Sequence, residues 1–147
     1  LRGGTSNVAW AIGLAYALKF NRESLEKDSL HIEKLRNYFI DKVLKVVDGA
    51  KVNGSIEKRL KNNANICFAG VDGRALLNIL DLNGICASLG AACSVGSVLP
   101  SHVLLAMGLT EEEAFSSIRF TFSKDNSFEE VDYTIEVLKN TVEKLKK

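Results

Sequence analysis

Apolar residues recur every three or four positions through the last twenty residues of the chain, and this periodicity restricts the segment to an amphipathic helix. Ser127 and Glu130 form a capping box just before it, and lysines end it, as the helix dipole favours. The stripe must be buried against another layer. It consists of Phe128, Val131, Ile135, Leu138, Val142 and Leu145.

A second helical stripe and a clear strand precede this segment. Residues 32–46 carry apolar side chains at helical spacing, and Asp48 and Gly49 stop the helix. Ile118, Phe120 and Phe122 alternate with Arg119 and Thr121, which predicts a strand with Arg119 on the polar face, away from the core.

Shorter elements complete the pattern. We expect a short strand and a loop in residues 50–63, strands at 65–69 and 85–88, and a helix that Asp72 caps and Asn83 and Gly84 end. Pro100 suits the first turn of a further short helix. Because the strands do not alternate regularly with helices, the sequence predicts an α+β domain with helices packed on one side of a small, mostly antiparallel sheet.

Residues 8–18 are apolar on every side of the helix that Ser6 can cap. We expect this helix to be buried between layers, with Trp10 and Tyr16 in the core. The stretch is shorter than the roughly 20 residues of a membrane span, so no membrane partner is expected. No signal peptide opens the chain, and a cytoplasmic location is the working assumption.

Length and charge agree with one soluble domain. The 147 residues carry a formal net charge of +1, and no basic patch interleaved with aromatics predicts a nucleic-acid partner. The three cysteines, Cys67, Cys86 and Cys93, have no metal-binding spacing, and their odd number argues against a disulfide framework. No metal is expected.

Cys93 is the first candidate for chemistry. Cysteine is most often a small buried hydrophobe, as expected of Cys67 between Ile66 and Phe68. Cys93 instead lies in an almost entirely small-residue stretch, Gly90 to Ser97, which favours a mobile loop. The start of the next helix and His102 in its first turn could favour its thiolate form.

Arg119 and the N-terminal segment are the other candidates. Arg119 is either an exposed strand residue in a surface ion pair or a fork that binds the α-carboxylate of an amino acid. Glycines and a helix-opening hydroxyl in residues 2–7 could present backbone amides to a phosphate, although this signal alone is weak.

Taken together, several motifs resemble the cysteine desulfurase family of class V aminotransferase-like enzymes. Most specific is the cysteine loop followed by Pro-Ser-His-Val-Leu at residues 100–104 and Ala-Met-Gly-Leu at 106–109. Ser-Ile-Arg-Phe at 117–120, the opening Arg-x-Gly-Thr-x-Asn-Val and the closing Glu-Glu-Val-Asp-Tyr-Thr-Ile extend the likeness over nearly the whole chain.

The resemblance implies the small C-terminal domain of a fold-type I enzyme that depends on pyridoxal 5'-phosphate, with residues 1–20 as the connecting helix from a large domain. The family's cofactor lysine stands in a Ser-x-His-Lys context, which no lysine here has, so this chain alone should be inactive. A homodimer that uses L-cysteine and passes sulfur to an acceptor, such as an iron–sulfur scaffold protein, is implied for the full-length protein.

The same resemblance assigns roles to residues. Cys93 resembles the nucleophile that takes sulfur from L-cysteine as a persulfide and releases L-alanine, and Arg119 resembles the clamp for the substrate carboxylate. Thr5 resembles a hydroxyl that reaches the cofactor phosphate of the neighbouring subunit. Apart from the resemblance, His102, Ser94 and Gly96 are candidates for supporting the loop, because they lie in it or beside it.

Two departures from the family pattern concern partners more than chemistry. Leu99 replaces an acidic residue, and residues 121–125 replace the common Ser-Leu-Gly-Arg. Alternatives to a desulfurase are a selenocysteine lyase, another class V aminotransferase-like enzyme, or a stand-alone thiol-based interaction module.

Overall fold

The computed structural model describes residues 3–90 and 99–146 of the chain. In chain order the elements are α1 (Val8–Val46), β1 (Ala50–Val52), β2 (Asn63–Phe68), α2 (Gly73–Leu82), β3 (Ser88–Leu89), α3 (His102–Ala106), α4 (Glu111–Phe115), β4 (Ser117–Thr121) and α5 (Phe128–Leu145). The four strands form one antiparallel sheet in the order β1-β2-β4-β3. The predicted α+β class and antiparallel sheet are confirmed.

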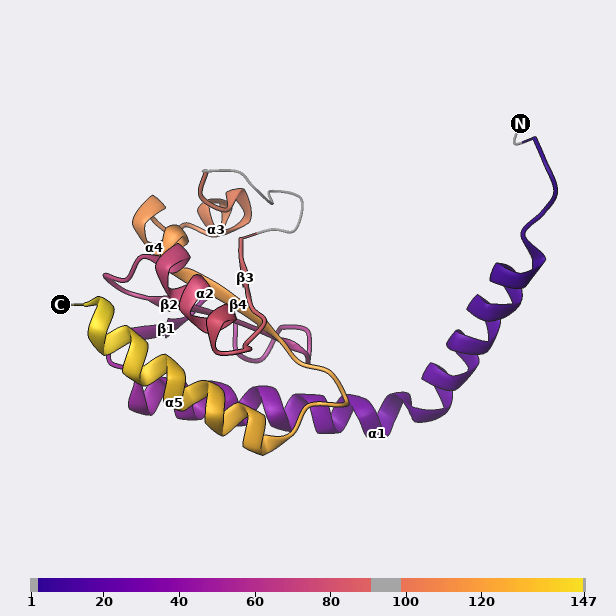
Figure 1. Ribbon diagram of the computed structural model, residues 1–147, viewed down its shortest axis with the longest axis horizontal. Coiled ribbons are helices and arrows are strands. Elements are labelled where there is room, and N and C mark those ends of the chain that lie inside the picture. Colours follow the sequence, from indigo (N-terminus) through magenta and orange to yellow (C-terminus); the bar gives the residue numbers. More distant parts are fainter. Residues whose placement is uncertain (1–2, 91–98, 147) are drawn as a thin grey trace.

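One face of the sheet carries the core. Ile66 and Phe68 of β2 and Ile118 and Phe120 of β4 are buried on this face, beside Leu89 of β3. Helices α1, α2 and α5 cover it, and α1 and α5 lie side by side (Figure 1). The helical side chains of this hydrophobic core are Leu35, Phe39, Ile40 and Val43 of α1, Leu76 and Leu80 of α2, and Val131, Ile135, Leu138 and Val142 of α5.

The local signals that the sequence carries begin and end these helices as expected. Asp72 accepts hydrogen bonds from the backbone of α2, and Ser127 and Glu130 form a reciprocal capping box on α5. Thr110 and Glu113 do the same for α4. Gly49 and Gly84 have φ values of 73°, the left-handed conformation that lets the chain leave a helix without a Cβ clash.

The prediction of a buried first helix is wrong. Residues 8–18 and 32–46 belong to one helix, α1, whose first half extends away from the rest of the chain (Figure 1). Trp10 is 78% exposed and Tyr16 is 57% exposed. An all-round apolar helix needs partners on every side, and the described residues supply none to this half of α1.

Two further boundaries differ from expectation. The strand predicted at 85–88 is only the pair Ser88–Leu89, while Ile85 is buried in the core and Cys86 is exposed. Pro100 lies outside α3, immediately before its N-cap residue Ser101, and not in the first turn of the helix. No helix in residues 3–90 or 99–146 combines the length and apolar character needed to cross a membrane.

Candidate functional site

The face of the sheet opposite the core is polar, and it carries Arg119. Because side chains alternate along β4, burying Ile118 and Phe120 on the core face places Arg119 on the other. Arg119 pairs in register with Asn65 of β2 on one side and Ser88 of β3 on the other. Paired residues point to the same face of a sheet, so three polar side chains form a row across three strands.

Ser88 holds one arm of the Arg119 side chain. Nη2 of Arg119 donates a hydrogen bond to Oγ of Ser88 at 3.1 Å, and the arginine is half-buried. A salt bridge to Arg119 is not among those formed by the described residues. The surface-pair interpretation of Arg119 therefore finds no carboxylate partner there, and the guanidinium keeps donors for a ligand.

Arg119 lines a cavity of about 390 Å³ between the polar face of the sheet and α3. Among the described residues, its lining holds three cationic side chains, Arg119, Arg59 and Lys58, and no acidic one. Apolar atoms of Val103, Leu104 and Met107 form part of the wall from α3. A positive cavity with an apolar wall suits a small anionic ligand that has an apolar part.

The guanidinium of Arg59 holds the wall of this cavity in place and is largely occupied by hydrogen bonds to the backbone. Its guanidinium donates to the backbone oxygens of Ser55 at 2.7 Å, Asn53 at 2.7 Å and Asn63 at 3.4 Å. Burial, and then the charge of Arg36, lower its pKa, but an arginine remains protonated in proteins. Arg59 thus ties the loop after β1 to the sheet, and Arg119 has the more available donors.

The cavity also touches residues on both sides of Cys93 in the sequence. Gly90 and Ser101 line it, and they flank the segment that holds Cys93. Cys93, Ser94 and Gly96 themselves lie outside the described residues. His102 is the first residue of α3 and is exposed, without a place in the cavity lining. Arg119 and the loop ends are therefore brought together, and His102 lies beside them.

Thr5 stands apart from this arrangement. It is exposed in the segment before α1, at the end of the helix that extends away from the sheet (Figure 1). Gly4 beside it has a φ of 96°, a conformation open to glycine. Thr5 and Arg119 do not meet within the part of the chain that the structure describes.

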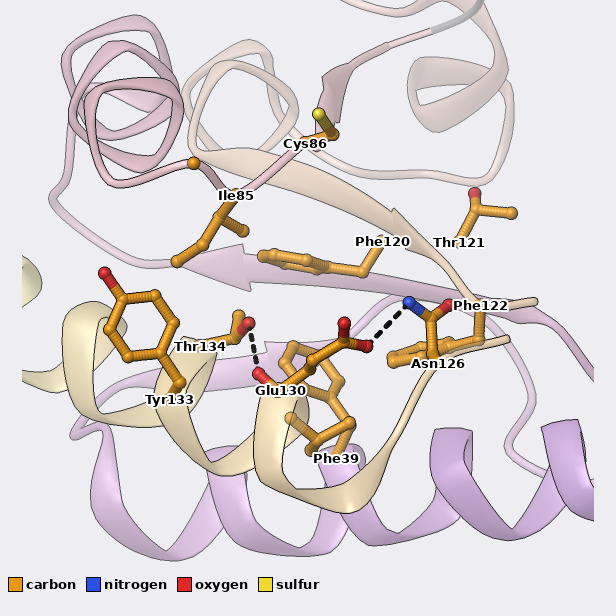
Figure 2. Close-up of a pocket in the computed structure, with 12 residues that line it drawn as sticks. Phe39, Ile85, Cys86, Phe120, Thr121, Phe122, Asn126, Glu130, Tyr133 and Thr134 are labelled. Carbon is orange, nitrogen blue, oxygen red and sulfur yellow. Dashed lines mark hydrogen bonds between the residues drawn. The ribbon is translucent and has the colours of Figure 1, made fainter. Parts of the chain in front are cut away.

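The other two cysteines differ sharply from each other. Cys67 is 2% exposed, and burial raises the pKa of its thiol. A buried neutral thiol is a poor nucleophile. Cys86 is exposed and lines a second cavity, of about 360 Å³, at the start of α5 (Figure 2).

This second cavity does not suit an anion. Figure 2 shows Asn126 donating to the carboxylate of Glu130, and that hydrogen bond, followed by one from the backbone of Ser127, lowers the pKa of Glu130. Among the described residues, its lining contains this carboxylate and no lysine or arginine. The Arg119 cavity is therefore the better candidate for carboxylate binding.

The described residues fit a substrate carboxylate better than a pyridoxal ring. A pyridoxal site pairs the ring nitrogen with an acidic or basic side chain and joins the cofactor to a lysine. The Arg119 cavity has no carboxylate and no aromatic side chain in its lining. The ring therefore finds no complete set of partners in residues 3–90 and 99–146. Within that same part of the chain, no cluster of His, Cys, Asp or Glu could hold a metal ion.

Sequence reasoning missed Asn53 and Asn65 as residues of this site. They were placed only in a segment of strand and loop and in a strand, yet both line the Arg119 cavity. The available signal was the alternation along β2, where Asn63, Asn65 and Cys67 share the face opposite Ala64, Ile66 and Phe68. Which of them would lie beside Arg119 depends on the register with β4.

Comparisons with known proteins point in one direction. The chain is 41% identical over 145 residues to the cysteine desulfurase IscS of Dictyoglomus turgidum, covering 99% of this chain and 37% of that protein. It is 38% identical over 146 residues to cysteine desulfurase IscS 1 of Archaeoglobus fulgidus, covering 99% and 38%. The chain thus spans a little over a third of the length of these curated relatives.

Solved structures and a family model agree. A NifS-like protein superposes with a TM-score of 0.84 at 32% identity, covering 99% of this chain and 36% of that one. A NifS-like protein from Rickettsia africae gives 0.82 at 30% identity, covering 97% and 36%. The model of the aminotransferase class-V family matches residues 1–134. The chain, a homologue of cysteine desulfurases, therefore belongs to the aminotransferase class-V family.

Proposed function

We propose that this chain is the C-terminal part of a cysteine desulfurase that takes sulfur from L-cysteine onto Cys93 and releases L-alanine. The observation that supports this most is the Arg119 cavity, which is cationic, has no acidic side chain among the described residues of its lining, and touches both Gly90 and Ser101, which flank the Cys93 segment. An amino-acid carboxylate held by Arg119 would lie near the place where that thiol is tethered.

Each of the two residues has a separate task. Arg119 binds the α-carboxylate through its planar fork and so orients the substrate. The thiolate of Cys93 attacks the substrate sulfur: a sulfur–sulfur bond forms, the carbon–sulfur bond breaks, and its electron pair stays on the substrate carbon, which gains a proton to give alanine. Pyridoxal phosphate, held mainly by residues outside this chain, supplies the electron withdrawal for this family's chemistry.

The exposed half of α1 supports the same proposal at the level of domains. Its apolar side chains, including Trp10 and Tyr16, have no cover within the described residues. In proteins of the relatives' length, residues 1–20 would connect this domain to a large cofactor-binding domain and pack against it. Thr5 would then reach the cofactor phosphate across a homodimer interface, far from Arg119 of its own chain.

The proposed reaction is tested by identifying the cysteine that receives the sulfur. The full-length protein with pyridoxal phosphate is incubated with L-cysteine, and persulfides are mapped by mass spectrometry. We expect the added sulfur on Cys93, equal amounts of alanine, and loss of both in the Cys93→Ser variant. Cys86→Ser is the matched control and should retain both products. Sulfur on Cys67 or Cys86 with Cys93 unmodified would contradict the proposal.

A further inference from the structure

A chain of hydrogen bonds fixes the direction of one side-chain amide at the edge of the Arg119 cavity. It begins at the backbone oxygen of Glu113, which accepts a hydrogen bond from Oγ of Ser117 at 2.6 Å. A carbonyl oxygen can only accept, and a hydroxyl has one proton. The proton of Ser117 is therefore committed to Glu113, and Ser117 can only accept from its other neighbours.

The next member is Asn53. Its side-chain nitrogen Nδ2 lies 2.8 Å from Oγ of Ser117 and 2.6 Å from Oδ1 of Asn65. An oxygen of Asn53 at that place would face the lone pairs of Ser117, so the amide must present its nitrogen. Both N–H groups of the Asn53 side chain therefore donate hydrogen bonds, one to Ser117 and one to Asn65, and the acceptor on Asn65 is its side-chain oxygen. Asn53 is 9% exposed, and its own backbone is tied to Asn65 at 2.9 Å.

The amino group of Asn65 is consequently turned away from Asn53. It has two N–H donors, and the described residues offer it no hydrogen-bond acceptor. Asn65 is half-buried and lines the same cavity as Arg119. The two residues are paired directly across β2 and β4, which brings their Cβ atoms to roughly 5 Å on one face.

We propose that Asn65 is a second carboxylate-binding residue beside Arg119, and that Asn53 is the positioning residue that keeps its amide in the donating orientation. This rests on the proposed function, because the ligand is the α-carboxylate of the amino-acid substrate. Arg119 and the amino group of Asn65 then donate to one carboxylate from neighbouring strands, and Ser88 holds the guanidinium from the third strand.

An isosteric change tests the direction of the amide. Asn65→Asp keeps an oxygen for Asn53 and replaces the cavity-facing amino group with a second oxygen, so a donor becomes a negatively charged acceptor. In the full-length protein with pyridoxal phosphate, we expect KM for L-cysteine to rise about tenfold or more, as loss of a hydrogen bond to a charged group predicts, with kcat little changed. Asn65→Ala should raise KM by less than Asn65→Asp does. Asn53→Ala should also raise KM, although Asn65 itself is unchanged, because its amide is no longer held in the donating orientation.

Asn63→Asp is the matched control. Asn63 lies two residues earlier on the same face of β2 and also lines the cavity, but it pairs with Thr121 and not with Arg119. We expect it to change KM far less than Asn65→Asp. Calorimetric affinity for L-alanine, which has the same carboxylate, should follow the same order without any turnover. A thermal midpoint near that of the wild type shows that the variant is folded.

Arg119→Ala, measured in parallel, separates the two levels of the argument. If it leaves both KM and alanine affinity unchanged, the carboxylate site of the proposed function is wrong. If it weakens both while Asn65→Asp weakens neither, only the role of Asn65 is wrong. Equal effects of Asn63→Asp and Asn65→Asp would also refute that role, because the effect would then be general charge repulsion.

Discussion

Replacing Gly73 with alanine should destabilise the domain through one backbone contact. Gly73 is the first residue of α2 and is buried. A Cβ built on it would overlap the backbone oxygen of Phe115 and would come within 2.9 Å of Cδ2 of Leu89. A leucine tip can rotate away, but a carbonyl oxygen at the end of α4 moves only with its helix.

The size of the effect follows from two opposing terms. Overpacking against a rigid group costs about 1–3 kcal/mol, while alanine gains at most about 1 kcal/mol over glycine within a helix. We expect a net loss of about 2 kcal/mol in the free energy of unfolding. For a domain of this size each kcal/mol corresponds to roughly 4 °C, so the thermal midpoint should fall by about 8 °C.

Urea unfolding of the 147-residue chain, followed by circular dichroism, measures this loss. Gly13→Ala is the matched control, since Gly13 is also helical and its added Cβ would meet nothing within 4 Å. We expect that control to be as stable as the wild type or slightly more so. A Gly73→Ala variant with an unchanged urea midpoint would refute the close approach of α2 to the end of α4.

Two further predictions concern ionisable groups. In the folded chain, iodoacetamide should modify exposed Cys86 readily and Cys67 only on unfolding, because burial raises the pKa of the Cys67 thiol; equal rates by peptide mapping would contradict this. Hydrogen bonds from Asn126 and Ser127 lower the pKa of Glu130 in the folded chain. The ionised carboxylate therefore stabilises the fold above the unfolded pKa of about 4.3, and this contribution is lost as the pH falls through the lower pKa of the folded state. Glu130→Gln should therefore give a shallower loss of stability in acid than the wild type, and identical acid limbs in urea titrations would refute the assignment.

Elements whose signals are local were predicted well from the sequence. The capping box at Ser127 and the Asp72 cap depend on residues two or three positions apart, and both are present. The alternation around Arg119 also placed it correctly, because burial of two neighbours on one face decides the other face. These interactions are contained in a short window and need no knowledge of the rest of the fold.

The first half of α1 shows where such reasoning fails. An apolar surface on every side of a helix indicates that partners exist, but periodicity cannot say whether they belong to the same chain. Trp10 was assigned to the core for that reason and is 78% exposed.

The Asn53–Asn65 pair illustrates a third kind of limit. Asn53 next to Gly54 is a strong turn signal, and Gly54 does have a φ of 79°. The same asparagine also donates to Ser117, which is 64 residues away. Its second role appears only when β1, β2 and β4 are assembled, so no pattern within the segment could have predicted it.

The two faces of the sheet depend on each other through a single register. Ile118 and Phe120 are held by the core, and the same pairing of β2 with β4 sets Asn65 opposite Arg119. A shift by one residue would bury the guanidinium and expose the apolar pair, at a cost far above the stability that any one polar contact contributes. The energy that orients the proposed carboxylate site is therefore supplied mainly by the apolar side chains behind it, and the polar row needs only the weaker hydrogen bonds of Ser88 and Asn53 for its final alignment.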